Sequence, residues 1–312
     1  MSRASSAALR AYEPARDEPT VLALWGACLG ERWPVEPAAF RRILAGGEHV
    51  VAELDGRTVG FAATYPGGRR PGLLLLLVDP AHQRRGLGRA LHDQALARLR
   101  ERGASAARLA AGGGGRYFWP GVPVDLPQAW AFFDALGWKS EELAADLTLD
   151  LADYATPGWV YERLGGQGVT LATAAPEDAD EVVAWERRHL PGWEAFFAAP
   201  FASSEPDDVL LARGSDGAIL GTILLNGPDA HWHGPLTWAR RLGPGTGAVG
   251  AVGVAESARD RGVGLALVAR ATELLKERRL ASSYVGWTWL RDWYGKLGYR
   301  VWMEYRVSAR EL

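Results

Sequence analysis

Apolar and polar positions follow the same order in the two halves of this chain. Each half contains an apolar strand-like run, a glycine-containing turn and a long segment with the apolar period of a helix. The central strands are expected at residues 73–78 and 248–254, and the helices after them at residues 86–102 and 262–279. The first of these strands is apolar throughout, which is typical of a strand buried on both faces. The pattern therefore predicts one α/β unit that is built twice.

The remaining elements fit the same division. In the first half, we expect further strands at residues 7–12, 49–54, 58–65, 108–111, 138–142 and 145–151, and helices at residues 19–29, 36–45 and 127–136. In the second half, we expect strands at residues 169–174, 209–213, 219–226, 283–287 and 299–307, helices at residues 177–189 and 290–297, and a short aromatic segment at residues 192–197. A glycine-rich stretch, residues 158–168, separates the halves. We expect two domains, residues 7–157 and 165–312, each a mixed central sheet flanked by helices.

The glycine turns lie at corresponding positions, 176 residues apart in the sequence. Gly86 and Gly88 follow the first central strand, and Gly262 and Gly264 follow the second. A turn between a strand and a helix N-terminus presents unpaired backbone N–H groups and the positive end of the helix dipole. Each half is therefore predicted to carry an anion-binding turn.

Composition narrows the classes of partner. The chain of 312 residues has a formal net charge of −2 and a pI near 6.3, which gives no electrostatic reason to expect nucleic-acid binding. Cys28 is the only cysteine, so an internal disulfide and a cysteine metal cluster are excluded, and we expect no metal. The sequence contains neither an apolar run of membrane-spanning length nor a signal-peptide pattern. We expect a cytoplasmic protein with no membrane partner; the sequence does not indicate its oligomeric state.

The order of strand, Gln/Arg-x-x-Gly-x-Gly turn, helix, strand and a helix ending in Leu-Gly-aromatic resembles the GNAT N-acetyltransferase family, once in each half. The resemblance implies that the turn binds the pyrophosphate of acetyl-CoA, the co-substrate, through backbone amides. It also implies that the central strand diverges from its neighbour and pairs with the pantetheine. The cofactor-binding residues that it implies are Val78, Gln83, Arg84, Arg85, Gly86, Leu87, Gly88 and Arg89 in the first half, and Val252, Val254, Arg259, Asp260, Arg261, Gly262, Val263, Gly264, Leu265 and Ala266 in the second.

One position distinguishes the two halves chemically. Tyr294 stands four residues before Gly298, where the resemblance implies a catalytic hydroxyl that protonates the departing CoA thiolate. Phe133 stands four residues before Gly137 and has no proton to give. We therefore expect the second half to be catalytic and the first to be a degenerate copy. The sequence leaves open whether the first half binds CoA, supports the fold or shapes the substrate site, and whether Tyr294 is only a packing aromatic.

No general base stands out. Many members of the family place a carboxylate near the central strand, but residues 247–254 contain none. The candidates elsewhere in the second half are Asp229, His231, His233 and Glu256. The sequence does not choose among them.

Two tandem units in one chain are similar to mycothiol synthases and to glucosamine or glucosaminide N-acetyltransferases. The predicted function is acetyl-CoA-dependent N-acetylation of a primary amine on a small molecule, with an amino sugar as the candidate acceptor. Transfer is expected to be direct, because no suitable nucleophile lies in the motif. Three tryptophans of the second half are candidates to stack on a sugar ring or to cover a cation, which are Trp232, Trp287 and Trp289.

Three alternatives remain. The protein is a non-catalytic acyl-CoA-binding regulatory module, an interaction protein that recruits a partner through the loop around Trp119, or an acetyltransferase for a peptide or protein amine. Dispensability of Tyr294 would favour a non-catalytic class. The loop around Trp119 is expected either to dock on the other domain or to cap the sheet of its own half.

Overall fold

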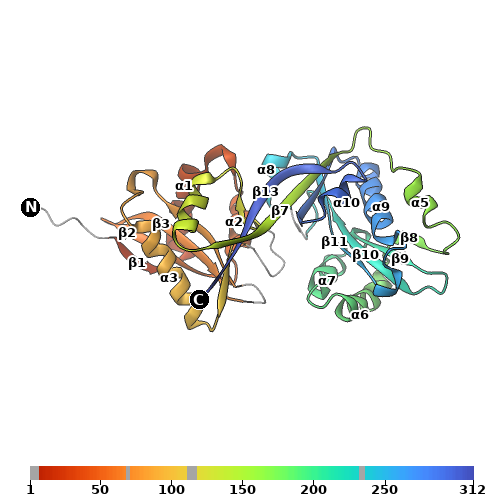
Figure 1. Cartoon of the computed structure of the whole chain (residues 1–312), viewed down its shortest axis with the longest axis horizontal. Helices are drawn as coiled ribbons and strands as arrows, with labels where there is room; N and C mark the ends of the chain where they lie inside the picture. Colours follow the sequence, from red (N-terminus) through yellow and green to blue (C-terminus); the bar gives the residue numbers. More distant parts are fainter. Residues whose placement is uncertain (1–6, 68–70, 111–117, 232–235) are drawn as a thin grey trace, which may run out of the picture. The chain divides into compact units, whose positions relative to one another are not determined.

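The computed structural model describes residues 7–67, 71–110, 118–231 and 236–312. The chain folds as two compact units, one formed by Met1–Ala144 together with Met303–Leu312 and the other by Ala145–Trp302. Each unit contains a mixed sheet flanked by helices (Figure 1). The predicted α/β fold with two related units is therefore confirmed.

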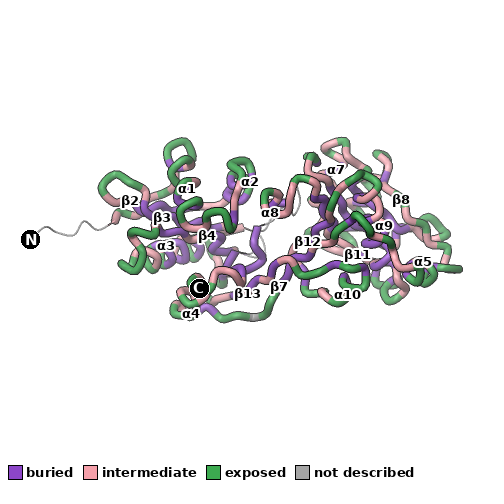
Figure 2. Tube along the Cα trace, turned by 90° about the horizontal axis from the view of Figure 1, so that it is seen from above, coloured by how far each residue is buried: buried purple, intermediate pink, exposed green. Residues whose placement is uncertain are grey.

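The sheet of the first unit is antiparallel except where its central strand meets the next one. Its strand order is β1-β2-β3-β4-β5-β13, and β6 pairs with β13. The strands are β1 (Ala8–Ala11), β2 (Glu48–Leu54), β3 (Arg57–Tyr65), β4 (Gly72–Val78), β5 (Ala106–Leu109), β6 (Val122–Pro123) and the greater part of β13 (Arg300–Glu311). The pair β4–β5 is parallel. Buried positions gather along β3 and β4 (Figure 2).

Helices cover both faces of this first sheet. They are α1 (Pro14–Leu29), α2 (Pro37–Leu44), α3 (Leu87–Glu101) and α4 (Pro127–Ala135). Ala62 of β3 packs with Leu91 of α3. Its neighbour Phe61 points to the opposite face, where its ring lies 6.4 Å from that of Phe40 in α2. The alternation of β3 thus fills two separate apolar layers.

The second unit repeats this plan. Its strand order is β7-β12-β11-β10-β9-β8. The strands are β7 (Lys139–Asp150), β8 (Thr170–Thr173), β9 (Val209–Arg213), β10 (Ile219–Asn226), β11 (Thr246–Val254) and β12 (Ser282–Thr288). The helices are α5 (Trp159–Glu162), α6 (Ala179–His189), α7 (Glu194–Ala202), α8 (Ala239–Leu242), α9 (Val263–Glu277) and α10 (Arg291–Gly295). Ile223 of β10 packs with α9, whereas Leu224 packs with α6 and α7.

Two strands are exchanged between the sequence halves. Residues 145–150 of β7 come from the first half but pair with β12 in the second unit. Residues 309–311 of β13 come from the second half but pair with β5 in the first unit. The predicted contiguous ranges, 7–157 and 165–312, therefore differ from the compact units. Each of these closing strands pairs its backbone groups with the edge strand of the other unit. The hydrophobic periodicity of a strand does not predict which sheet edge it joins.

Two smaller expectations also need correction. Residues 138–142 and 145–151 were expected as separate strands, but β7 runs unbroken from Lys139 to Asp150. The aromatic segment at residues 192–197 is the start of a helix, α7, whose Phe197 is buried against Trp185. Phe118 and Trp119 lie in the core of the first unit, where the Trp119 ring stacks 6.0 Å from that of Trp25. The described part of the Trp119 loop therefore caps its own unit.

Candidate active site

The central strand of each unit diverges from its parallel neighbour. In the first unit, β4 pairs with β5 only at Gly72 and Leu73. In the second unit, β11 pairs with β12 only from Thr246 to Ala248. Among the described residues, the later parts of β4 and β11 therefore have no strand partner on that side, and each sheet opens toward its glycine turn. Unpaired backbone along a strand edge can hydrogen-bond an extended ligand.

Both turns have the same backbone conformation. Arg84 and Gly86 have φ angles of 61° and 83°, and Asp260 and Gly262 have φ angles of 62° and 93°. Left-handed residues at alternate positions turn successive N–H groups toward one side, which makes a concavity for an anion. The first backbone bond of each helix is made by Ala90 or Ala266, whose N–H donates to the glycine at the helix start. The N–H groups before them face the turn and suit a phosphate group.

The second glycine of each turn serves packing. A Cβ atom at Gly264 would lie 3.2 Å from Val254 Cγ2 and 3.5 Å from the Trp293 ring. A Cβ atom at Gly88 would lie 3.3 Å from the Phe132 ring. The structure shows that they let the helix approach the central strand and the aromatic residue of α10 or α4.

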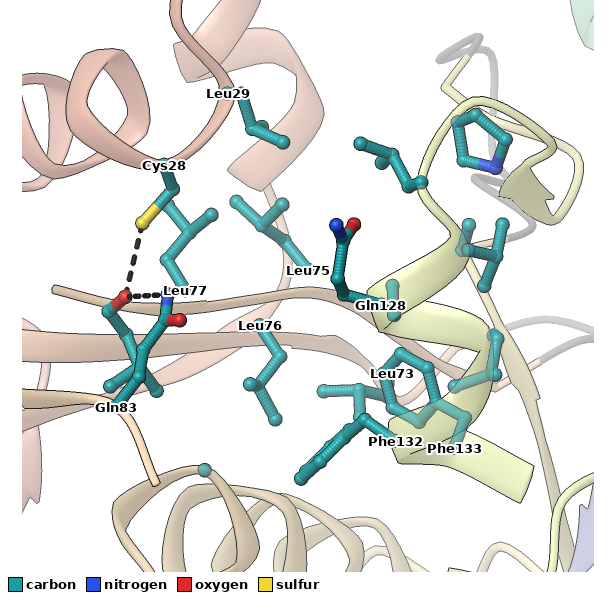
Figure 3. A pocket seen from close by; sticks show the side chains of 18 of the residues that line it. Cys28, Leu29, Leu73, Leu75, Leu76, Leu77, Gln83, Gln128, Phe132 and Phe133 are labelled. Atoms are coloured by element: carbon teal, nitrogen blue, oxygen red, sulfur yellow. Dashed lines mark hydrogen bonds between the residues drawn. The ribbon is translucent and has the colours of Figure 1, made fainter. Parts of the chain in front are cut away.

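A cavity of about 1470 Å³ opens along β4 in the first unit. Figure 3 shows Cys28 and Leu29 of α1 on one side of it, and Gln128 and Phe132 of α4 on the other. Its lining includes six of the eight residues that were expected at the CoA site of the first half, which are Val78, Gln83, Arg84, Gly86, Gly88 and Arg89. Arg85 and Leu87 are not part of this lining.

The cavity holds a carbonyl oxygen with two side-chain partners. Cys28 Sγ lies 3.2 Å from the Val78 carbonyl oxygen, and Gln83 Nε2 donates to the same oxygen at 3.0 Å (Figure 3). Burial raises the pKa of the Cys28 thiol to about 11, so the thiol is neutral near pH 7. This strand end is therefore already hydrogen-bonded within the unit.

In the second unit, side chains from the segment after α5 lie against the turn. Arg163 Nη2 donates to the Asp260 carbonyl at 2.6 Å, and its side chain lies over Gly262. Arg261 Nε donates to Gln167 Oε1 at 2.9 Å. Arg163 therefore adds a guanidinium beside Arg261 at the predicted anion site. Arg163 lies in the glycine-rich stretch of residues 158–168, and the sequence did not predict that its side chain would lie against the turn.

Tyr294 lies on α10, next to the residue that contacts the turn. Its ring is 4.8 Å from that of Trp293, and the residue is 5% exposed. Burial raises the pKa of the Tyr294 hydroxyl above its ordinary value, so the hydroxyl is protonated near neutral pH. Tyr299, 5.8 Å away between ring centroids, has its hydroxyl bonded to Thr272 and Ser283. Among the described residues, the Tyr294 hydroxyl has no such partner.

The central strand of the second unit bulges near its open end. Thr222 pairs with Gly253 and Leu224 pairs with Gly250, so β11 has one residue more than β10 in this interval. Ala251, inside the bulge, has a φ of 51°. A bulge leaves backbone groups out of the ladder and re-aims them. These groups are candidates to polarise a carbonyl held along β11.

The base candidates with a described position are all exposed. Asp229 and Glu256 lie on the surface, and the His231 ring bonds Glu205 at 3.0 Å with 76% of its side chain exposed. His233, like Trp232, lies outside the described residues. Glu186 of α6, which the sequence pattern did not indicate as a base, is fully buried and faces β10. No group of three or more His, Cys, Asp or Glu side chains in the described ranges is arranged to hold a metal ion.

Comparison with known proteins decides the family. The profile of the Acetyltransferase (GNAT) family matches residues 19–138 and again residues 173–299. The chain belongs to the GNAT acetyltransferase family. Each matched GNAT region contains one open strand and one glycine turn, and the second contains Tyr294. The tandem arrangement expected from the repeated motif is confirmed.

Relatives of this GNAT chain include mycothiol acetyltransferases and a glucosamine N-acetyltransferase region. A mycothiol acetyltransferase from Clavibacter sepedonicus is 32% identical over 219 residues, covering 65% of this chain and 60% of the relative. Another from Amycolatopsis mediterranei is 31% identical over 255 residues, covering 79% of this chain and 77% of the relative. A solved structure, described as a GCN5-related glucosamine N-acetyltransferase region in a fungal multi-domain beta-N-acetylglucosaminidase, superposes with a TM-score of 0.90 at 31% identity.

The fungal match covers 99% of this chain and 38% of the fungal one. The chain thus spans less than two thirds of the fungal chain and of the Clavibacter relative. Within the described residues, none of the helices has both the length and the apolar character needed to cross a membrane.

Proposed function

We propose that this GNAT protein transfers the acetyl group of acetyl-CoA to a primary amine of a small molecule, with an amino sugar as the acceptor. The second unit carries out the transfer, and the first unit binds CoA or supports the fold without catalysing. The observation that carries the proposal is a chain of contacts in the second unit. The Trp293 ring of α10 lies against Gly264 at the glycine turn, and the Tyr294 ring packs against the Trp293 ring. Among the described residues, the Tyr294 hydroxyl has no hydrogen-bond partner.

The second unit fits acetyl-CoA in three places. The turn at residues 259–262 offers backbone N–H groups and the guanidinium groups of Arg163 and Arg261 to a pyrophosphate. The unpaired edge of β11, including Val252 and Val254, offers hydrogen bonds to the pantetheine amides. When bound, acetyl-CoA supplies an activated acyl group as a thioester.

In the second unit, one group of atoms stabilises the negative charge that develops during transfer, and another donates a proton to the leaving sulfur. Backbone N–H groups at the β11 bulge stabilise negative charge on the acetyl oxygen as the amine nitrogen bonds to the acetyl carbon. The Tyr294 hydroxyl gives its proton to the sulfur as the carbon–sulfur bond breaks. No side chain forms a covalent bond to the acetyl group. Cys28, the single thiol, belongs to the first unit.

An amino-sugar acceptor is supported by the relatives of this chain, one a glucosamine N-acetyltransferase region and the others mycothiol acetyltransferases. It is also supported by aromatic side chains at the end of β12. Trp287 and Trp289 have ring centroids 6.2 Å apart, and Trp289 is 42% exposed. The backbone N–H of Trp287 donates to Oδ1 of buried Asp146 at 2.8 Å, and this bond fixes the backbone at the end of β12. Indole faces suit the apolar face of a sugar ring.

Free-thiol release from acetyl-CoA tests the proposal when it is measured against amino sugars, polyamines, aminoglycosides and amino-terminal peptides. We expect turnover with an amino sugar and an N-acetylated product by mass spectrometry. CoA binding without turnover on any acceptor would favour the regulatory-module alternative. Turnover on peptides alone would overturn the acceptor class.

A further inference from the structure

Resting on the proposed function, we propose that Glu186 is the proton acceptor for the incoming amine and that it acts through the hydroxyl of Thr222. No residue of β10 or β11 is titratable, so a base for this site must come from another element. Glu186 reaches the sheet from α6, on the face opposite α9.

Glu186 lies one hydrogen bond away from β10, the strand that pairs with the central strand β11. Thr222 Oγ1 donates to Glu186 Oε1 at 2.6 Å. Thr222 pairs with Gly253 of β11, where a Cβ atom would overlap Leu190 Cδ1 and would lie 3.4 Å from Thr222 Oγ1. Gly253 adjoins the bulge at Ala251. Glu186 Oε1 and Thr222 Oγ1 thus form a row of two polar atoms between α6 and the segment of β11 along which the acyl group would lie.

Both polar side chains, the Glu186 carboxylate and the Thr222 hydroxyl, are fully enclosed. Glu186 and Thr222 have 0% exposure. Glu186 Oε2 has no hydrogen-bond partner among the described residues. An enclosed carboxylate oxygen without a partner costs stability and calls for an explanation in function. A role in proton transfer supplies one.

The first unit shows the same scaffold without this chemistry. Asp17 and Asp178 correspond, because each accepts the backbone N–H at the start of its helix, from Glu13 and Ala175 respectively. Eight residues after Asp17 stands Trp25, and eight residues after Asp178 stands Glu186. Both are buried.

The positions of the first unit that correspond to Thr222 and Gly253 also carry large apolar side chains. Gly60 pairs with Val78 and Gly221 pairs with Val254, which aligns the two sheets. By this register, Phe61 and Leu77 of the first unit correspond to Thr222 and Gly253 of the second. Three apolar residues, Trp25, Phe61 and Leu77, are thus replaced by Glu, Thr and Gly only in the unit that carries Tyr294.

The surroundings hold Glu186 ready to accept a proton. Burial is the main cause that raises the pKa of Glu186 to about 7. The hydrogen bond from Thr222 lowers this pKa, and the negative charge of Glu194 raises it. Glu194 is the only titratable residue of α7, and the titratable residues of α6 within four positions of Glu186 are Arg187, Arg188 and His189. A base whose pKa lies near the working pH is the most effective kind.

The proton steps balance as follows. The ammonium form of the acceptor gives a proton to the Thr222 oxygen as the Thr222 proton passes to Glu186 Oε1. The freed nitrogen lone pair bonds to the acetyl carbon, and the carbon–sulfur bond breaks as Tyr294 protonates the sulfur. The second proton that leaves the nitrogen restores the Tyr294 hydroxyl. Glu186 releases its proton to solvent, so one proton is released per acetyl group transferred.

Substitution of the two residues tests the relay. Glu186→Gln keeps the shape of the side chain and removes its basicity, and kcat should fall about 10²–10⁴-fold. The acidic limb of the kcat–pH profile, with both substrates saturating, should disappear. Thr222→Val should lower kcat similarly, Thr222→Ser should retain it, and the double variant should be no worse than either single one. Asp180→Asn, an exposed carboxylate on the same helix, is the matched control and should change neither kcat nor the profile.

A second readout does not depend on turnover. The carboxyl carbon of Glu186, labelled with ¹³C and assigned by its loss in Glu186→Gln, should titrate near neutral pH in the free protein. If Glu186→Gln keeps both kcat and the acidic limb while the unmodified protein acetylates its acceptor, the relay is overturned and the proposed function stands. If the unmodified protein acetylates no amine, both are overturned.

Discussion

Glu186 stands on the buried face of α6, at the spacing of Val182 and Trp185. Positions i, i+3 and i+4 share a helix face, so the sequence contained a signal that this carboxylate is enclosed. Its partner could not be predicted. The contact with Thr222 joins residues 36 positions apart, and it depends on how α6 crosses β10.

At the residue scale, pH should affect stability through Glu186. Its pKa is raised from 4.5 to about 7 on folding, so the folded state holds this proton more tightly than the unfolded state. The resulting contribution is present below pH 4.5 and is lost as pH rises through about 7. At 1.36 kcal/mol per pKa unit, the loss is about 3 kcal/mol.

Denaturant unfolding of the unmodified protein and Glu186→Gln, measured between pH 5 and pH 8, checks this contribution. The stability of Glu186→Gln relative to the unmodified protein should increase by about 2.5 kcal/mol over that range. A difference that stays constant with pH would mean that Glu186 is ionised in the folded protein at pH 5.

At the element scale, the central strands, turns and following helices could be predicted within a few residues. Their signals are local: apolar runs, glycines and helical spacing. The conformation of the turn could not be predicted in full, because Arg84 and Asp260 adopt left-handed φ angles that glycine usually supplies. The bulge at Ala251 was also not predictable, since it reflects the register between β10 and β11.

The two glycine turns provide a matched pair of variants. Gly264→Val places a branched side chain against Val254 and Trp293, and the displaced α10 would carry Tyr294 out of position. A shift of about 1 Å can cost about 10²-fold in turnover. Gly88→Val disturbs Phe132 in the same way in the first unit, at a similar cost in stability, about 1–3 kcal/mol.

Kinetics and thermal unfolding of the two variants measure this difference. We expect Gly264→Val to lose turnover and Gly88→Val to keep it. Equal loss of turnover in both variants, with folding preserved, would show that the first unit takes part in the reaction.

At the scale of the whole molecule, the exchange of closing strands is the feature that the sequence concealed. A strand's apolar pattern specifies which face is buried, and it does not specify which sheet edge the strand joins. The repeated motif predicted the two units correctly, and it suggested that each half closes on itself. Residues 303–312 instead complete the first unit.

Removal of residues 303–312 should therefore affect the first unit most. β5 loses its pairing with Ala309, Arg310 and Glu311, and β6 loses its pairing with Tyr305 and Arg306. Hydrogen exchange should accelerate in β5 and β6 and stay slow in β9 and β10, whose partners remain. Equal acceleration in both sheets would contradict this division.

The central claim is that the second unit transfers an acetyl group with Tyr294 as proton donor. The measurement that tests it most directly is kcat for free-thiol release by Tyr294→Phe, using an amine for which the chemical step limits the rate. Phe133 occupies the matching place in the first unit, so a phenylalanine ring is compatible with this helix. We predict a fall of about 10²–10⁴-fold in kcat with acetyl-CoA affinity unchanged. Full kcat in Tyr294→Phe would show that Tyr294 only packs the core and would contradict the account.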